Sequence, residues 1–151
     1  MLSASELQAR AKAATNVGHH ERALSLLDRA RARATTDDER ALIEGTAGYA
    51  HLELGHLDQA RRVTDDAVRL AATDDVRGIV LGQRAVVRGR TGAREEALAD
   101  FADAIALLHH RPEYLGRCLL NRGTLRLRAA SVRDATDDFA GALAAFAAAG
   151  L

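Results

Sequence analysis

The sequence predicts an all-α protein, a right-handed α-solenoid of four helix–turn–helix units with about eight helices. The first reason is an internal repeat, because four segments align without gaps at a nearly constant interval, beginning at Gly18, Gly55, Gly92 and Ala130. The second is that apolar residues recur at three- and four-residue spacings. The third is that no segment alternates polar and apolar residues as a half-buried strand would. One unit cannot bury its own apolar stripe, so we expect the stacked units to form a single domain.

The units are expected to span approximately residues 4–35, 36–72, 73–110 and 111–149. Each begins with residues that suit a helix N-terminus. Ser3 and Thr36 are both followed three residues later by glutamate, which is the spacing of a capping box. Thr73 precedes two aspartates, whose charge is favourable at the first turn of a helix. Pro112 suits the first turn of the seventh helix, where a backbone N–H has no partner inside the helix.

A turn separates the two helices of each unit, and glycine occupies the same place in three of the turns. These glycines are Gly18, Gly55 and Gly92, with Ala130 at the equivalent place in the fourth unit. A left-handed residue, usually glycine, commonly ends a helix. The second helices then carry an amphipathic stripe. In the third unit the stripe consists of Ala97, Leu98, Phe101, Ala104, Ile105 and Leu108.

Small residues recur at one fixed place on both helices of every unit. On the first helices these residues are Ala11, Gly48, Ala85 and Gly123. On the second helices they are Ala23, Ala60, Ala97 and Ala135. Small side chains let two helices approach closely, so we expect these positions to be helix contacts. One larger residue also occupies an equivalent place in each second helix and should insert between neighbouring helices. These residues are Leu27, Thr64, Phe101 and Phe139.

The composition excludes several classes of protein. The chain has 151 residues, 21 basic and 21 acidic side chains, and a formal net charge of zero. Balanced, interspersed charges argue against nucleic acid or a membrane as a partner. The single Cys118 excludes a disulfide scaffold, and no apolar run is long enough for a transmembrane helix. The N-terminal segment from Met1 to Val17 lacks the apolar core of a secretory signal, so we expect a cytoplasmic protein.

The repeat resembles the tetratricopeptide repeat (TPR), in a bacterial, Ala/Arg-rich type with units of 37–38 residues. The TPR signature has Leu-Gly and Tyr in the first helix and Ala-x3-Phe in the second. The run Asn121 to Leu125 (NRGTL), with Ala135 and Phe139, resembles a common variant of that signature. His51, Arg88 and Arg126 stand where the family usually has Tyr. The resemblance implies a concave face, lined by the first helices, that binds a peptide or a partner protein.

The resemblance also implies which residues line that face. In the second to fourth units they are Tyr49, Glu53, Gln83, Val86, Arg90, Arg117, Asn121, Thr124 and Arg128. The first unit adds Gln8, Ala9, Lys12 and Asn16. Relatives that clamp a terminal carboxylate use Lys or Arg and Asn from successive units. Here only Arg117 and Asn121 match that set, so we do not expect such a clamp.

Arginines form a repeated strip on the later first helices. Arg84 and Arg88 lie four residues apart and recur as Arg122 and Arg126, so each pair shares one helix face. One interpretation is a basic strip for phosphates or acidic peptides. The other is internal pairing with aspartates of the second helices, which the balanced charge favours. The candidate aspartates are Asp100, Asp103, Asp134, Asp137 and Asp138.

No catalytic site, metal site or cofactor is expected. His19 and His56 occupy equivalent turns of different units, and packed helices about 10 Å apart would hold them too far from one shared ion. Cys118 lies on an apolar helix face and is interpreted as a small buried hydrophobe. No third group would orient a Cys–His pair, and no glycine-rich phosphate loop is present.

The C-terminal segment from Phe139 to Leu151 carries no charge. A terminal solenoid helix normally needs a polar outer face, so Leu143, Phe146 and Leu151 should contact something. Three arrangements are open: the chain is part of a longer repeat protein, two copies associate through this end, or the helix folds onto the fourth unit. We favour the first two.

The function expected from these observations is a protein–protein interaction scaffold. It would bind a peptide or partner protein on the concave face, self-associate through the apolar C-terminal helix, or do both. One alternative is the non-catalytic repeat region of a larger enzyme, such as a caspase-like CHAT-domain protease. Another is the ligand-sensing domain of a bacterial regulator.

Overall fold

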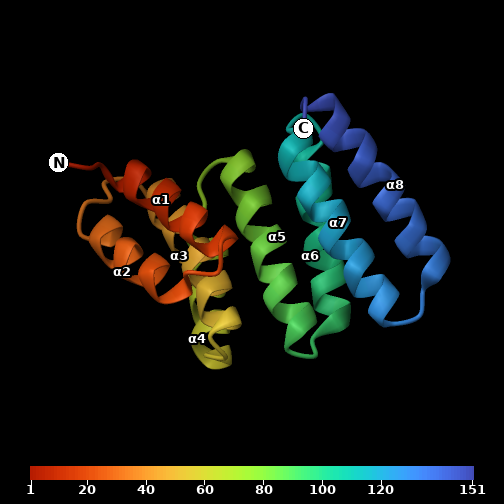
Figure 1. Ribbon diagram of the computed structural model, residues 1–151, viewed down its shortest axis with the longest axis horizontal. Helices are drawn as coiled ribbons and strands as arrows, with labels where there is room; N and C mark the ends of the chain where they lie inside the picture. The colour runs from red at the N-terminus through yellow and green to blue at the C-terminus, as the bar shows by residue number, and fades with distance from the viewer.

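The computed structural model describes residues 1–151 and contains eight α-helices and no strand (Figure 1). The all-α prediction is therefore confirmed. The first helices of the four pairs are α1 (Ala4–Asn16), α3 (Asp37–Glu53), α5 (Asp74–Arg90) and α7 (Pro112–Arg128). The second helices are α2 (His20–Arg31), α4 (Leu57–Leu70), α6 (Arg94–Leu108) and α8 (Val132–Ala148). Each pair packs against the next, which makes an α-solenoid of helix–turn–helix repeats.

The predicted N-terminal caps are present. Ser3 Oγ accepts a hydrogen bond from the Glu6 N–H at 3.1 Å, and the Glu6 carboxylate accepts one from the Ser3 N–H at 2.8 Å. Thr36 and Glu39 form the same capping box at the start of α3. Thr73 caps α5 with its side-chain oxygen. These bonds satisfy backbone donors that a helix leaves unpaired at its first turn.

The turns within the units share one backbone conformation. Gly18, Gly55 and Gly92 have φ of +83°, +80° and +94°, the left-handed region in which glycine has no Cβ penalty. Ala130 takes the same conformation at φ +61° in the fourth unit, and it is the one non-glycine residue with positive φ. An L-residue with a Cβ is strained there, at a cost of about 1–2 kcal/mol. The fourth turn therefore keeps the shared geometry with a less suitable residue.

Close helix contacts occur at the small positions. The four small residues of the second helices are at most 1% exposed. On the first helices, a Cβ added at Gly48 would overlap the Cγ2 of Thr64. A Cβ at Gly123 would lie 2.7 Å from the ring of Phe139. Glycine is thus needed at both places because a β-branched or aromatic side chain of the second helix fills the space.

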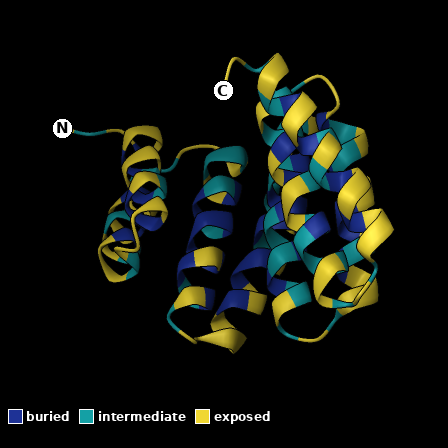
Figure 2. Ribbon diagram, turned by 45° about the vertical axis from the view of Figure 1, so that its right-hand side comes forward, coloured by how far each residue is buried: buried dark blue, intermediate teal, exposed yellow.

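The core runs through the whole stack. One apolar cluster joins residues of α1 to α4, and a second joins residues of α3 to α7. Leu27, Thr64 and Phe101, which the sequence predicted to be inserted residues, are at most 1% exposed. Figure 2 shows buried positions where helices face one another and exposed positions on their outer sides. Each unit therefore buries its apolar stripe against the next one.

The C-terminal helix differs in part from the expectation. Leu143 and Leu151 are 72% and 76% exposed. Phe146, which we expected to be unpartnered like them, is half-buried, because its ring packs over the backbone of Gly116 in α7. A Cβ at Gly116 would lie 2.7 Å from that ring. Phe146 is thus part of the fourth unit's own packing, whereas the two leucines are not.

Candidate functional site

The repeated arginines do not form a free basic strip. Arg84 makes a bidentate pair with Asp100, with Nε to Oδ2 at 2.8 Å and Nη2 to Oδ1 at 2.9 Å. Arg88 donates to the same carboxylate at 3.0 Å. Asp65 of α4 lies 3.3 Å from Arg84 and completes the cluster. The hydrogen bonding of Arg84 to the Asp100 carboxylate, in which Arg84 is the donor, raises the pKa of Arg84.

The fourth unit repeats this arrangement. Arg122 makes a bidentate pair with Asp138 at 3.0 and 2.7 Å, and Arg126 donates to the same carboxylate at 2.8 Å. The Asp138 side chain is 4% exposed. A carboxylate that is so deeply buried needs paired charges, and the two arginines provide them. Internal pairing is therefore the correct interpretation of these four arginines.

The histidines and the cysteine do not assemble a metal site. His51 and His56 approach each other, with their Nδ1 atoms 3.2 Å apart, because the turn after α3 brings its last residues back over the helix end. Burial, then the proximity of His56, lowers the pKa of His51. No group of three or more His, Cys, Asp or Glu side chains is placed to hold an ion. Burial raises the pKa of Cys118 to about 11, so its thiol stays protonated and unreactive at neutral pH.

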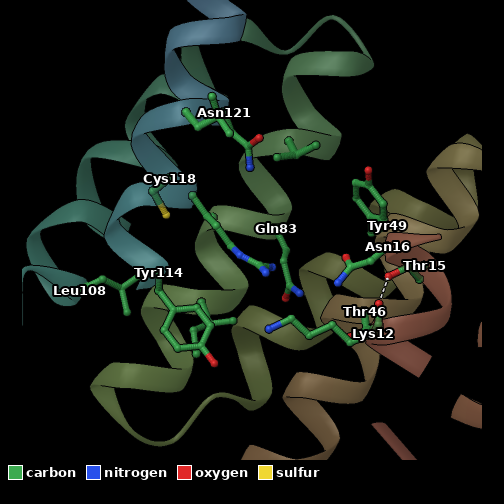
Figure 3. Close-up of a pocket in the computed structure, with 15 residues that line it drawn as sticks. Lys12, Thr15, Asn16, Thr46, Tyr49, Gln83, Leu108, Tyr114, Cys118 and Asn121 are labelled. Carbon is green, nitrogen blue, oxygen red and sulfur yellow. Dashed lines mark hydrogen bonds between the residues drawn. The ribbon is translucent and has the colours of Figure 1, made fainter. Parts of the chain in front are cut away.

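A pocket opens on the concave side between the first helices of the units (Figure 3). Its volume is about 280 Å³. We call it the central pocket. Side chains of α1, α3, α5 and α7 line it together with Leu108 at the end of α6. The lining residues are Lys12, Thr15, Asn16, Thr46, Tyr49, Ile79, Gly82, Gln83, Val86, Leu108, Tyr114, Arg117, Cys118, Leu120 and Asn121.

The pocket exists because α7 departs from α5. The two helices approach closely at Gly82, where an added Cβ would lie 2.9 Å from the Sγ of Cys118. Away from that contact they are held apart, and α5 packs far more extensively on α3. Lys12 of α1 reaches across this gap, because its Nζ lies 5.2 Å from the centre of the Tyr114 ring in α7. The first and fourth units thus meet across the pocket.

The charge in the central pocket is positive and unneutralised. Lys12 and Arg117 line it, and none of its lining residues is acidic. Neither cation forms an ion pair within 4.0 Å. Burial, then repulsion from Arg117, lowers the pKa of Lys12, and Glu113 beside the pocket opposes this shift. The pocket therefore holds a half-buried lysine and an exposed arginine, and no acidic residue lines it.

A shallower second pocket of about 110 Å³ continues the concave surface. It shares Tyr49, Val86 and Asn121 with the central pocket. The remaining lining residues are Ala85, Gly89, Arg90, Phe101, Thr124, Leu125 and Arg128. Among the nine groove residues predicted from the sequence, eight line one or both pockets. The ninth, Glu53, lies beside them and accepts a hydrogen bond from Arg90 at 2.8 Å.

The central pocket collects the residue types that are rare in this chain. The sequence contains two tyrosines, two asparagines, one lysine and one cysteine, and all six line the pocket. The groove predicted from the sequence included Lys12 and Asn16 but missed Tyr114, which lies two residues after Pro112 in the first turn of α7. Rarity was the available signal. Ala, Arg, Leu and Asp dominate this chain. A rare residue type that does not recur at the equivalent place in other units is not needed for the packing of the repeat.

No helix is both long and apolar enough to cross a membrane. No protein-family model matches the sequence, and no curated protein sequence matches it. Among solved structures the fold is similar to the crystal structure of MamA, with a TM-score of 0.63 and 17% sequence identity. The likeness covers 97% of this chain and 80% of that one. The chain accordingly has a TPR-like helical-repeat fold.

Proposed function

We propose that this chain is a protein-interaction scaffold without catalytic activity of its own, and that its concave face binds a protein or peptide partner. The observation that carries the proposal is the continuous surface formed by the central and second pockets. This surface presents partly exposed apolar side chains beside hydrogen-bonding groups. Tyr49 is 38% exposed and Leu120 is 43% exposed, next to Asn121 and Thr124. Aromatic anchors with polar neighbours are typical of protein-binding surfaces.

The repeat packing supports the same proposal. The backbones that carry the groove residues are fixed by buried contacts, at Ala85 of α5 and Gly123 of α7. A partner would therefore meet a preformed surface and would lose little free energy in ordering it. The TPR-like fold is consistent with such a role, although the fold alone does not specify a partner.

A matched pair of threonines tests the proposal. Thr124 lines the second pocket, whereas Thr136 is exposed on α8, and both hydroxyls donate to the backbone carbonyl four residues earlier in their helix. Thr124→Arg should obstruct the groove and weaken partner binding by roughly tenfold or more, since the bulky charge lies within the contact surface. Thr136→Arg should leave binding unchanged.

The measurement starts with affinity capture from a lysate of the source cells, followed by titration of the purified partner against wild type and both variants. Equal affinity for all three proteins would reject the concave face as the binding surface. Circular dichroism of each variant establishes that the helices are intact.

Self-association through α8 is a second candidate, favoured by the exposure of Leu143 and Leu151. Two copies could cover these leucines against each other, since apolar side chains on a terminal helix are stabilised by leaving water. Light scattering at micromolar concentration should then show a dimer that Leu143→Glu dissociates. Leu57→Glu, at an exposed leucine of α4, is the control. A monomeric wild-type protein would exclude this candidate. Phe146 is unsuitable for the test because it packs on Gly116.

A further inference from the structure

The central pocket contains two cations and no acidic residue, whereas the two buried aspartates of the chain, Asp100 and Asp138, are both paired. Four arginines of α5 and α7 share Asp100 and Asp138. Lys12 and Arg117 have no such partner, although the chain has as many acidic as basic side chains. The single carboxylate nearby, Glu113, is exposed and does not line the pocket. An anion from outside would supply the missing charge.

The polar and apolar residues that line the pocket indicate which other chemical groups a bound anion would contain. Asn16, Gln83 and Asn121 place three side-chain amides around the pocket (Figure 3). The Oε1 of Gln83 is buried and has no hydrogen-bond partner, because it lies against Gly45. Tyr49 and Tyr114 form walls on opposite sides. These groups suit a ligand with an amide or hydroxyl group and a compact apolar part.

The volume of the central pocket favours a short ligand. Its volume of about 280 Å³ lies at the lower limit of small-molecule pockets. An extended peptide advances about 3.3 Å per residue, so several residues would not fit within it. Lys12 extends from α1 towards Tyr114 of α7 and partly closes the pocket on that side (Figure 3). A free small molecule fits this shape better than a segment of a protein.

We propose that the central pocket is a binding site for a small organic acid, whose carboxylate lies between Lys12 and Arg117 and whose amide or hydroxyl group contacts Asn16 and Asn121. The inference rests on the proposed function, because the pocket lies on the same concave face. The bound acid would bridge the first and fourth units. A small molecule would in this way set how closely the two ends of the concave face approach, and thereby regulate the binding of a partner.

The test uses N-acetylleucine, which combines a carboxylate, an amide and a compact apolar side chain. N-acetylleucinamide is the matched probe without charge. The readout is the ¹H–¹⁵N spectrum of the side-chain amides, of which the chain has five. The acid should shift the signals of Asn16, Asn121 and Gln83 but not that of Gln59, which is exposed on α4. N-acetylleucinamide should bind roughly tenfold more weakly or not at all.

Two variants locate the charge. Lys12→Met and Arg117→Gln should each weaken binding of the acid by roughly tenfold, whereas Arg10→Gln, at an exposed arginine of α1 that lines neither pocket, should not. Equal shifts with the acid and its amide, or binding that survives both pocket variants, would overturn the inference. So would binding of acetyl-Ala-Ala-Ala-Leu with affinity equal to that of N-acetylleucine, since the site would then recognise chain ends.

Failure of this inference is distinguishable from failure of the proposed function. Thr124 lies in the second pocket and does not line the central pocket. Loss of partner binding in Thr124→Arg, with no effect of N-acetylleucine on the amide signals, would support the scaffold and reject the acid site. The reverse result would support the acid site and reject the scaffold.

Discussion

The Arg–Asp clusters and the central pocket use the same kind of charged side chain in opposite ways. In the clusters, Asp100 and Asp138 each accept hydrogen bonds from two arginines, so the arrangement of the third unit recurs in the fourth. In the pocket, Lys12 and Arg117 lie on helices of the first and fourth units and have no acidic partner. The clusters join the two helices of the third unit and the two helices of the fourth. The pocket is left with a charge that nothing in the chain neutralises.

The difference teaches how to separate structural from functional charges in a repeat protein. Charged pairs that hold a unit together are expected to recur where neighbouring units pack in the same way, as the third and fourth units do. Arg84 and Arg122 recur, and so do their partners. Lys12 aligns with Tyr49, Val86 and Thr124 in the other units, none of which is charged. The repeat therefore does not require a lysine at this place, which is consistent with the anion-binding role proposed for Lys12.

The largest effect is expected when a cluster loses its aspartate. Asp138→Ala would leave Arg122 and Arg126 without their buried partner, and breaking a buried pair in this way costs about 3–5 kcal/mol. Thermal unfolding should show a melting temperature lower by roughly 6–20 °C for a chain of this size. Asp137→Ala, at the exposed neighbouring position, should change it little.

The same variant also separates the two regions. The pocket does not include Asp138, so a folded Asp138→Ala protein should still bind N-acetylleucine at low temperature. If Asp138→Ala and Asp137→Ala were equally stable, the clusters would not hold the units together and the comparison would fail.

A smaller effect is expected at a close helix contact. Gly48→Ala places a Cβ onto the Cγ2 of Thr64, and overpacking of this kind costs about 1–3 kcal/mol despite the better helix propensity of alanine. Thr64→Ser removes that methyl group and keeps the hydroxyl that donates to the Ala60 carbonyl at 2.8 Å. Urea unfolding should show that the double variant is more stable than the sum of the two single changes predicts. Strict additivity would mean that the two residues are not in contact.

The sequence was sufficient for the fold but not for the site. Helix number, caps and turns follow from local chemistry, as at Ser3 and Gly55, and the repeat supplies the packing register. The central pocket depends on how far the stack curves, which brings Lys12 to Tyr114 from opposite ends of the chain. That curvature is the sum of small rotations between units, and no local pattern encodes it. For the same reason the packing of Phe146 on Gly116 was not foreseen.

Glycine in the turn of the fourth unit should increase the free energy of unfolding by about 1 kcal/mol. Ala130 is held at φ +61°, where the other units have glycine. Ala130→Gly relieves the strain of a Cβ in the left-handed region, and this gain exceeds the entropy that glycine adds to the unfolded chain. Urea unfolding should show a higher midpoint. Gly92→Ala is the reciprocal control and should lower it, since Gly92 has φ +94°.

The smallest effect concerns Lys12 itself. Removing this half-buried charge should stabilise the ligand-free protein slightly, so Lys12→Met is expected to be more stable than wild type at pH 7 by less than about 1 kcal/mol, because solvent screens the exposed part of the charge. Because burial and Arg117 lower the pKa of Lys12 in the folded state, the unfolded chain binds its proton more tightly. Wild-type stability should therefore rise with pH between that lowered pKa and 10.5, the ordinary value. Above this interval the advantage of Lys12→Met should disappear.

Urea unfolding at a series of pH values measures both curves, with Arg10→Met as the control for a lost charge on α1. If Lys12→Met stayed more stable than wild type by the same amount at high pH, the added stability would come from packing of the methionine and not from the lost charge. If Lys12→Met were less stable than wild type at pH 7, the ammonium would be a structural group, and the contrast between the pocket and the Arg–Asp clusters would vanish. N-acetylleucine should stabilise wild type and not Lys12→Met. If it removes the stability difference between the two proteins in this way, Lys12 is a residue that lowers the stability of the free protein and binds an anion.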